Sequence, residues 1–205
     1  MANMTNPERR KAKREAILDS ARTVFCRKGL IGVTMKDIIE ECGISRGGIY
    51  LYFDSVDAIF VETVKQRTNR KSDSIRQAIK DNMPFDELLN AYFVGHKDRL
   101  LNYMGNSMLR SMYEYFFTHK AEEDQKFQQE QLAHVKLTIC EILQLGVRQG
   151  VLRNHAMDEI AENFMFVIEG LSVLALIGGI TEEHIDRQIN IMCSLLPREN
   201  RRQYE

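Results

Sequence analysis

The stretch Thr34–Phe53, TMKDIIEECGISRGGIYLYF, constrains the fold of this chain more than any other. Its first half carries apolar residues at helical spacing, with Ile38 at the centre. Thr34 precedes them and can cap a helix through its hydroxyl group. Gly43 can end that helix, because glycine readily adopts the left-handed conformation found where helices stop. Ser45 can then cap a second segment. Two short helices joined by a turn that contains glycine form a helix-turn-helix.

The second short helix carries residues that its own core does not need. Gly47 and Gly48 lie at its start, where each costs about 1 kcal/mol relative to Ala, and Arg46 and Tyr50 point away from the expected core. This cost is understandable if a bulky partner approaches the backbone closely. The major groove of DNA is such a partner, because Arg and Tyr suit guanine edges and phosphates. The alternative interpretation is an ordinary exposed turn with an incidental arginine.

The charge of the chain is unevenly distributed. Residues 1–52 hold ten Lys and Arg against six Asp and Glu, whereas the remainder holds 18 against 23. A basic first quarter indicates a polyanionic partner for that end only. A basic cluster near the start is either an arm that lies near phosphates or a solvated tail. The cluster comprises Arg9, Arg10, Lys11, Lys13 and Arg14.

From Ile17 to Phe60 the chain reads ILDSARTVFCRKGLIGVTMKDIIEECGISRGGIYLYFDSVDAIF. This segment resembles the DNA-binding segment of the tetracycline-repressor (TetR/AcrR) regulators, and the two match without a gap. The resemblance implies an all-helical homodimer. In such regulators three N-terminal helices bind a palindromic operator, and a divergent C-terminal helical domain binds a ligand and dimerises.

The resemblance also implies particular DNA contacts. Thr34 and Tyr52 would contact phosphates, and Lys36 would add a backbone contact. The residues at or near the groove would be Ser45, Arg46, Gly48 and Tyr50. The residues expected to bind DNA are Thr34, Lys36, Ser45, Arg46, Gly47, Gly48, Tyr50 and Tyr52. Two positions depart from the family pattern, since Gly48 stands where members often carry Thr and Val56 where a Lys often opens the fourth helix. These departures concern affinity and operator sequence rather than binding itself.

The rest of the chain predicts helices throughout. Only three Pro and 12 Gly occur among 205 residues, so breaks are few. We expect an all-α fold of about nine helices. A helix-turn-helix DNA-binding domain would occupy residues 1–54, and a larger helical ligand-binding and dimerisation domain residues 55–205. Apolar spacing places the later helices near residues 56–82, 85–101, 103–120, 121–149, 158–177 and 182–196.

A set of Met and aromatic side chains between Tyr92 and Phe117 has two interpretations. Such residues line adaptable apolar pockets, but they also fill ordinary helical cores. The family resemblance favours a pocket. The residues expected to bind a ligand are Tyr92, His96, Met108, Met112, Tyr113, Phe116 and Glu169. Glu114 lies beside this set and could pair with a cationic ligand, although a carboxylate that is solvated or paired within the protein is the simpler expectation.

The expected helix at residues 158–177 is apolar on nearly all sides, so both of its faces need cover. One side can pack on its own domain and the other on a second subunit. The last two helices therefore resemble half of a homodimer interface, and the alternative is a monomeric bundle that absorbs both faces. Glu169 would be costly if buried without a partner. We expect it at the interface rim or in the pocket as a counter-charge.

These features predict a DNA-binding transcriptional regulator. We expect a homodimeric repressor of a palindromic double-stranded DNA operator, released by an unknown, small and largely apolar effector. The alternative is a helical regulator or architectural DNA binder without a small-molecule effector. The sequence has no catalytic motif, phosphate loop or metal-ligand spacing, so we expect no enzyme activity, catalytic residue, metal or cofactor. It has no membrane-length apolar run and no close cysteine pair, which favours a cytoplasmic protein.

Overall fold

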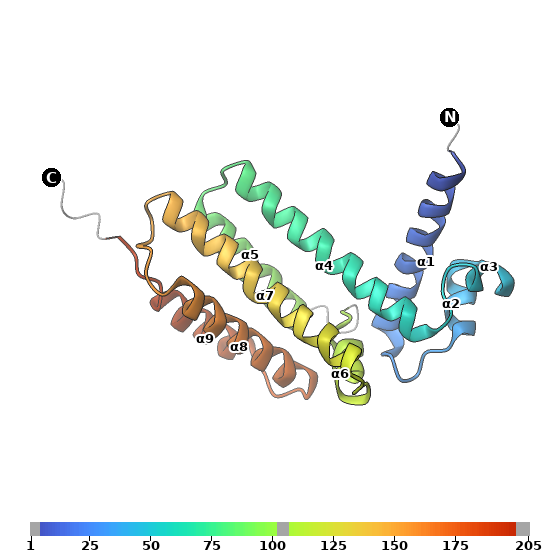
Figure 1. The fold of residues 1–205 in the computed structure, drawn as a ribbon. Helices are drawn as coiled ribbons and strands as arrows, with labels where there is room; N and C mark the ends of the chain where they lie inside the picture. The colour runs from blue at the N-terminus through green and yellow to red at the C-terminus, as the bar shows by residue number, and fades with distance from the viewer. Residues whose placement is uncertain (1–4, 102–106, 200–205) are drawn as a thin grey trace. The chain divides into compact units, whose positions relative to one another are not determined.

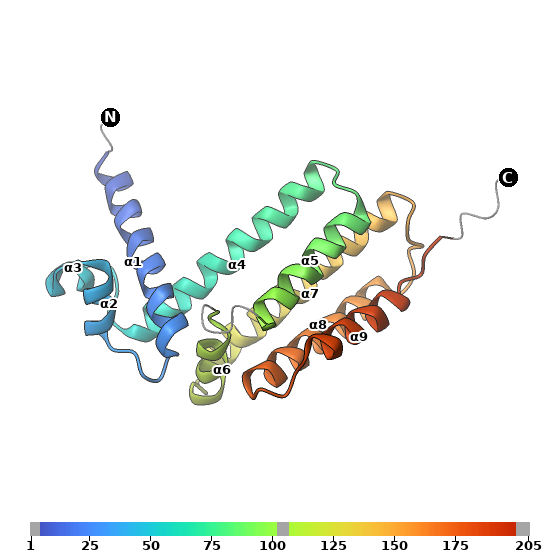
Figure 2. The same ribbon diagram turned by 180° about the vertical axis from the view of Figure 1, so that it is seen from behind.

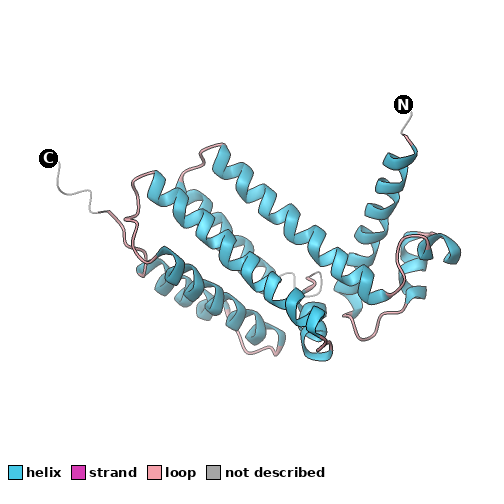
Figure 3. Cartoon of the chain, viewed as in Figure 1, coloured by secondary structure: helices cyan, strands magenta, loops and turns pink. Residues whose placement is uncertain are grey.

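The computed structural model describes residues 5–101 and 107–199. Within these ranges the chain forms nine α-helices (Figures 1 and 3). They are α1 Asn6–Lys28, α2 Met35–Cys42, α3 Arg46–Tyr50, α4 Val56–Lys80, α5 Phe85–Leu101, α6 Leu109–Thr118, α7 Glu122–Arg148, α8 Met157–Leu176 and α9 Glu182–Ser194. The all-α fold expected from the sequence is confirmed. None of the helices described is long and apolar enough to cross a membrane.

Most helix boundaries agree with the expectation, and the end of the fourth helix differs for an identifiable reason. The fourth helix ends at Lys80 rather than near Asn82, because Asn82 takes a left-handed conformation with φ 54° and turns the chain. The sixth helix was expected from Tyr103, and residues 103–106 lie outside the described ranges. Its described part begins at Leu109, whose N–H is accepted by the Ser107 hydroxyl at 3.1 Å.

By packing, the chain divides into two compact units. The first comprises Met1–Asn69 and Gly105–Lys120, and the second comprises Arg70–Met104 and Ala121–Glu205. α4 therefore contributes its first half to one unit and its second half to the other. This grouping describes packing. The assignment of DNA binding to residues 1–54, and of ligand binding and dimerisation to residues 55–205, stays a prediction.

The first unit is built on α1, which packs against α2 and α6. Within the helix-turn-helix module, the buried core comprises Ile17, Phe25, Ile38, Ile49 and Phe53. Ile39 and Ile44 are only half-buried. The core continues beyond these helices, because the ring of Phe60 on α4 meets Phe25 edge-on at 5.2 Å and stacks on Tyr115 of α6 at 5.1 Å.

The second unit is a bundle in which α5, α7, α8 and α9 lie side by side (Figures 1 and 2). Its core includes Phe85, Phe93, Ile142 and Phe164, all at most 4% exposed. Gly146 lets α7 approach this core closely, because a Cβ there would lie 2.8 Å from Phe85 Cδ2. Burying such side chains supplies most of the stability of a helix bundle.

Candidate functional site

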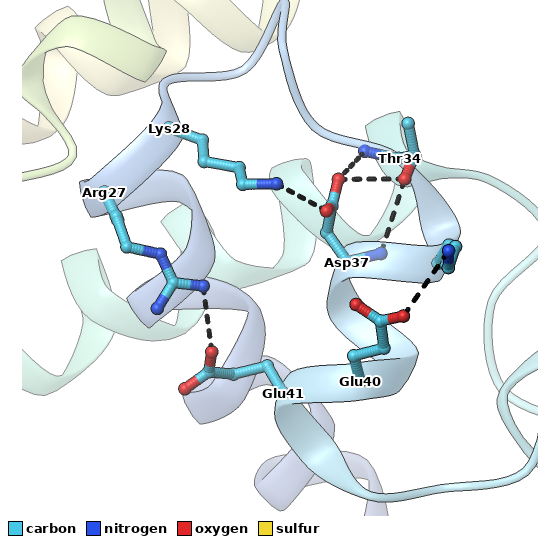
Figure 4. Close-up of polar contacts among 7 residues, drawn as sticks. Arg27, Lys28, Thr34, Asp37, Glu40 and Glu41 are labelled. Carbon is cyan, nitrogen blue, oxygen red and sulfur yellow. Dashed lines mark hydrogen bonds and ion pairs between the residues drawn. The ribbon is translucent and has the colours of Figure 1, made fainter.

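The start of α2 is held by a reciprocal cap, as Figure 4 shows. The backbone N–H and the hydroxyl of Thr34 both donate to one carboxylate oxygen of Asp37 at 2.8 Å, and the Asp37 N–H donates back to the Thr34 hydroxyl at 3.3 Å. The other Asp37 oxygen pairs with Lys28 at the end of α1, at 2.5 Å. The hydrogen bond from Lys28 and those from Thr34 lower the pKa of Asp37 to about 2.

A second ion pair aligns the same two helices. Arg27 on α1 contacts Glu41 on α2 at 3.0 Å (Figure 4). The two pairs lie at opposite ends of α2, so they fix its direction across α1. Lys36, one of the residues expected to bind DNA, has an 82% exposed side chain, and its one ion pair with a described residue is a 3.7 Å contact with Glu40 on the next turn. Such an exposed pair contributes little to stability and leaves the ammonium group accessible.

α3 is positioned by a cap at one end and a buried anchor in its middle. Gly43 takes the left-handed conformation with φ 62°, as expected for the end of α2. The Ser45 hydroxyl accepts the Gly48 N–H at 3.2 Å, and Ile49 is fully buried. The hydroxyl proton of Ser45 is directed to no residue within the described ranges. By contrast, the Thr34 hydroxyl proton is donated to Asp37, so a phosphate contact from Thr34 would require that group to rotate.

The outward face of α3 carries the polar residues expected there. Arg46 and Gly47 are exposed, and Tyr50 is 42% exposed. The Arg46 guanidinium makes no hydrogen bond or ion pair with any residue that the structure describes. Tyr52, just after the helix, is half-buried. An exposed guanidinium on a short, capped helix is available to a partner.

The presence of glycine at the two positions of α3 has two different explanations. A Cβ at Gly47 would meet no atom within 4 Å, so this position is open, as the expected close approach of a partner requires. A Cβ at Gly48 would lie 2.9 Å from Ile44 Cγ1 and 3.0 Å from the Ser45 hydroxyl. Gly48 is therefore needed for packing within the turn. The sequence interpretation, which explained both glycines by an external partner, was incomplete at this position.

The basic cluster on α1 is only partly available. Arg14 is engaged by its own unit, because its guanidinium pairs with Glu62 on α4 at 2.5 Å and lies 5.1 Å from the centre of the Phe53 ring. The other four members of the cluster are exposed on the first turns of α1. They are Arg9, Arg10, Lys11 and Lys13.

Glu114 on α6 has a structural role that the sequence did not indicate. Its carboxylate accepts the backbone N–H groups of Leu30 and Ile31, at 2.5 and 3.0 Å, and pairs with Arg110 at 2.7 Å. Burial raises the pKa of Glu114, but the N–H of Ile31, Arg110 and the N–H of Leu30 together lower it below its ordinary value. Nearby, the Ser111 hydroxyl donates to the Phe25 carbonyl at 2.8 Å. α6 is thus tied to the chain between α1 and α2.

The residues expected to bind a ligand are divided between the two units. Met108, Met112, Tyr113 and Phe116 belong to the first unit, where Met108 and Phe116 are buried. The Met112 sulfur lies 4.0 Å from an Arg67 nitrogen. Tyr92, His96 and Glu169 belong to the second unit.

In the second unit, His96 is the centre of a polar cluster. Its Nε2 lies 3.0 Å from Lys71 Nζ on α4, and its Nδ1 lies 2.8 Å from an Arg99 nitrogen. The ring packs against Tyr92, with centroids 4.6 Å apart, and the Lys71 ammonium lies 5.0 Å from the Tyr92 centroid. Burial raises the pKa of the Tyr92 phenol; Arg99 opposes this rise and Glu169 adds to it. Both charged groups therefore act on Tyr92.

Across the residues described, no three His, Cys, Asp or Glu side chains gather as a metal site would require. The second unit does have a hollow of about 410 Å³ between the end of α8 and the start of α9. It is lined by Val167, Gly170, Leu171, Leu174, Gly179, Ile180, His184, Arg187 and Gln188. None of the residues expected to bind a ligand is among them.

Comparison with known proteins connects this geometry to a family. Residues 17–63 match the family model described as bacterial regulatory proteins, tetR family. An uncharacterized HTH-type transcriptional regulator of Bacillus subtilis, YfiR, is 31% identical over 81% of this chain and 82% of its own. The probable acrEF/envCD operon repressor of Escherichia coli K12 is 25% identical over 83% of this chain and 76% of its own.

A solved structure shares the fold over nearly the whole chain. It is that of a putative transcriptional regulator from Saccharomonospora viridis in complex with choline, with a TM-score of 0.72 and 21% identity, covering 93% of this chain and all of that one. Together with the capped α2–α3 pair and the exposed face of α3, these matches establish the class of the protein. The chain belongs to the TetR family of bacterial transcriptional regulators, which are DNA-binding proteins rather than enzymes.

Proposed function

We propose that this regulator is a homodimeric repressor whose α3 helices enter the major groove of a palindromic operator. The observation that carries the proposal is the outward face of α3, where Arg46 is exposed beside the open backbone of Gly47 and the half-exposed Tyr50. Arginine commonly reads guanine through two hydrogen bonds in the major groove. Repression is the favoured direction because one of the relatives is named a probable operon repressor.

The proposed dimer uses the outer face of α8 and α9. Large apolar side chains are exposed along both helices, and Phe166 is 64% exposed and Ile177 73%. The others are Val173, Leu174, Ile191 and Leu195. Exposed apolar patches of this kind mark association surfaces, and Gly170 has no atom within 4 Å of its Cβ position, which permits close helix approach. Ser172 on the same helix is fully buried and so does not belong to this outer face.

A two-fold dimer would present two α3 helices to the two halves of a palindrome. Half-sites of such operators are spaced by about 34–36 Å, one turn of DNA, or a multiple of it. A small molecule that binds more tightly to a conformation in which the two α3 helices are wrongly spaced would lower operator affinity. The size of this effect is set by the difference between its affinities for the two conformations. The structural relative solved with choline supports a small-molecule effector. Four free, half-buried cysteines agree with the proposed cytoplasmic location.

The proposal is tested by selecting operators from random duplexes with the purified protein and then comparing two variants. Arg46→Ala should cost about 1–3 kcal/mol in operator binding and relax the preference at one base pair of each half-site. Lys36→Ala is the matched control, since it should weaken binding to all sequences and reduce the salt dependence by about one phosphate contact. If Arg46→Ala bound with unchanged sequence preference, Arg46 would not read bases.

The second candidate function is an architectural DNA binder, or a regulator without an effector. Competition with random DNA distinguishes an architectural binder from a specific regulator, because a specific regulator prefers its operator by at least about a thousandfold. The net charge of the chain is only −1, whereas sequence-independent binding depends on many phosphate contacts. This comparison favours the specific regulator.

A further inference from the structure

We propose that Leu51, the residue that follows α3, reads the 5-methyl group of a thymine in each half of the operator. The inference rests on the proposed function and deepens it, because it gives a base-specific contact to a residue that is not among those expected to bind DNA. The group recognised is a methyl on a pyrimidine in the major groove.

The first argument is the position of Leu51 on the helix. Leu51 has φ −72° and ψ −13°, so it continues the right-handed helical path of α3. Successive helical residues are about 100° apart, which places Gly47 and Leu51 within about 20° of the direction opposite Ile49. Ile49 is fully buried, and Arg46 and Tyr50 lie to one side of that direction. Gly47 and Leu51 therefore form the centre of the outward face of α3.

The second argument is the exposure of this centre. Leu51 is 74% exposed, more than any other large apolar side chain within residues 5–101 and 107–199. Residues four apart on a helix are neighbours, so Gly47 lies beside Leu51. A Cβ at Gly47 would meet no atom within 4 Å. A group that enters this open space meets the leucine side chain and the bare backbone of the glycine.

The third argument is the chemistry of the major groove. All four bases present hydrogen-bonding groups there, and thymine alone adds an apolar group, its 5-methyl. A leucine placed against a donor or acceptor would remove water from that group without replacing the hydrogen bond. Against a thymine methyl, the same side chain buries apolar surface on both partners. Leu51 therefore favours an A·T pair at one position of each half-site.

Two competing interpretations involve no base. Single exposed apolar side chains are common on protein surfaces, and a leucine that touches nothing would leave operator binding unchanged when it is replaced. A leucine that packs only on sugars would, when replaced, weaken binding to every sequence equally. Neither interpretation gives an effect that depends on a methyl group, so removal of the methyl distinguishes them from the proposal.

The test replaces thymine with uracil, which pairs with adenine in the same way and differs only in lacking the 5-methyl group. Each thymine of the selected operator is replaced in turn, and the Kd of the full-length protein is measured by fluorescence anisotropy. At one position, uracil should weaken binding about fourfold in one half-site and about fifteenfold in both. At that position, 5-methylcytosine should bind more tightly than cytosine by a similar factor.

Variants then assign this effect to a residue. Leu51→Ala should bind the thymine and uracil operators equally, whereas Leu51→Met, which keeps an apolar side chain of similar reach, should keep the difference. Ile31→Ala is the matched control, because it removes a side chain that is 69% exposed on the same unit. Ile31→Ala and Arg46→Ala should both keep the difference. Circular dichroism should give an unchanged Tm for Leu51→Ala, since the side chain is exposed.

Three results would each overturn the proposal. The first is a protein whose affinity is the same with uracil at every thymine position. The second is a Leu51→Ala variant that still distinguishes thymine from uracil. The third is a selected operator that requires no A·T pair in its half-sites.

Failure of this inference is distinguishable from failure of the proposed function. A protein that selects an operator but does not distinguish uracil from thymine keeps the proposed function and loses only the methyl contact. A protein that selects no operator from random duplexes loses both.

Discussion

Replacement of Glu114 by alanine tests whether α6 stabilises the helix-turn-helix unit. The carboxylate of Glu114 is 15% exposed and accepts two backbone N–H groups from the segment between α1 and α2. Alanine removes these acceptors and the ion pair with Arg110. The Leu30 N–H belongs to a residue that is only 5% exposed, whereas Ile31 is 69% exposed. Loss of the carboxylate will therefore affect the buried Leu30 N–H and the exposed Ile31 N–H differently.

The magnitude follows from these exposures. Leaving a buried donor such as Leu30 N–H without an acceptor costs about 1–3 kcal/mol, and a hydrogen bond whose donor can return to water contributes about 0.5–1.5 kcal/mol. The Arg110 pair, with an exposed guanidinium, adds at most about 1 kcal/mol. We expect Glu114→Ala to lower the free energy of unfolding by about 2–4 kcal/mol. For a chain of this length that corresponds to a fall in Tm of about 5–15 °C.

The assay is thermal unfolding followed by circular dichroism. Arg110→Ala is the control, because it removes the ion pair and keeps both backbone hydrogen bonds, and it should cost less than about 1 kcal/mol. Gly29→Ala provides an independent check. Gly29 has φ 79° and ψ −166°, a region that costs other residues about 1–3 kcal/mol. Its Cβ would also lie 2.6 Å from a Glu114 oxygen, so it would displace that carboxylate.

The two changes therefore share one interaction, and their costs should not add. In the Gly29→Ala background, Glu114→Ala should cost about 1–2 kcal/mol less than it does alone, since the contact is already broken. A change in Tm of less than about 2 °C in Glu114→Ala would refute the role assigned to the carboxylate. Full additivity of the two costs would refute the shared contact.

Three further predictions follow from the same structure. The stabilisation from Asp37, whose pKa is lowered from 3.8 to about 2, is fully present above pH 3.8 and is lost as the pH falls towards 2. The Tm difference between the protein and Asp37→Asn should therefore shrink over that interval. Phe166→Glu should convert the proposed dimer to monomers in sedimentation, whereas exposed Phe117→Glu should not. Residues 1–54 alone should unfold at a lower temperature than the whole chain, as circular dichroism will show, because they lack Phe60, which packs on Phe25.

The parts of the fold that depend on nearby residues could be predicted from the sequence. The cap of α2 joins Thr34 to Asp37 and the cap of α3 joins Ser45 to Gly48, so each is complete within four residues. Apolar spacing likewise placed the helices, because it reports directly which face each one buries. Even the exposed face of α3 follows from local pattern, since Ile49 fixes which side points inward.

The parts that could not be predicted depend on residues far apart in the sequence. Glu114 meets Leu30 and Ile31 across more than 80 positions, and the chain gives no local signal for a carboxylate that accepts backbone N–H groups. The His96 cluster likewise requires Lys71, 25 residues away, to be brought to it by the packing of α4 and α5. Gly48 shows the same limit at short range, because its close contact with Ile44 depends on the path of the turn.

The helices that share a core are consequently not always neighbours along the chain. Sequence reasoning ended the DNA-binding domain before α4, yet Phe25 of α1 is covered by Phe60 from α4, and Phe60 is stacked on Tyr115 from α6. Phe25 and Phe60 are both fully buried. α4 and α6 therefore complete the core around Phe25. A change that moves α6 must therefore either break the contacts of Glu114 and Tyr115 or carry α1 with it.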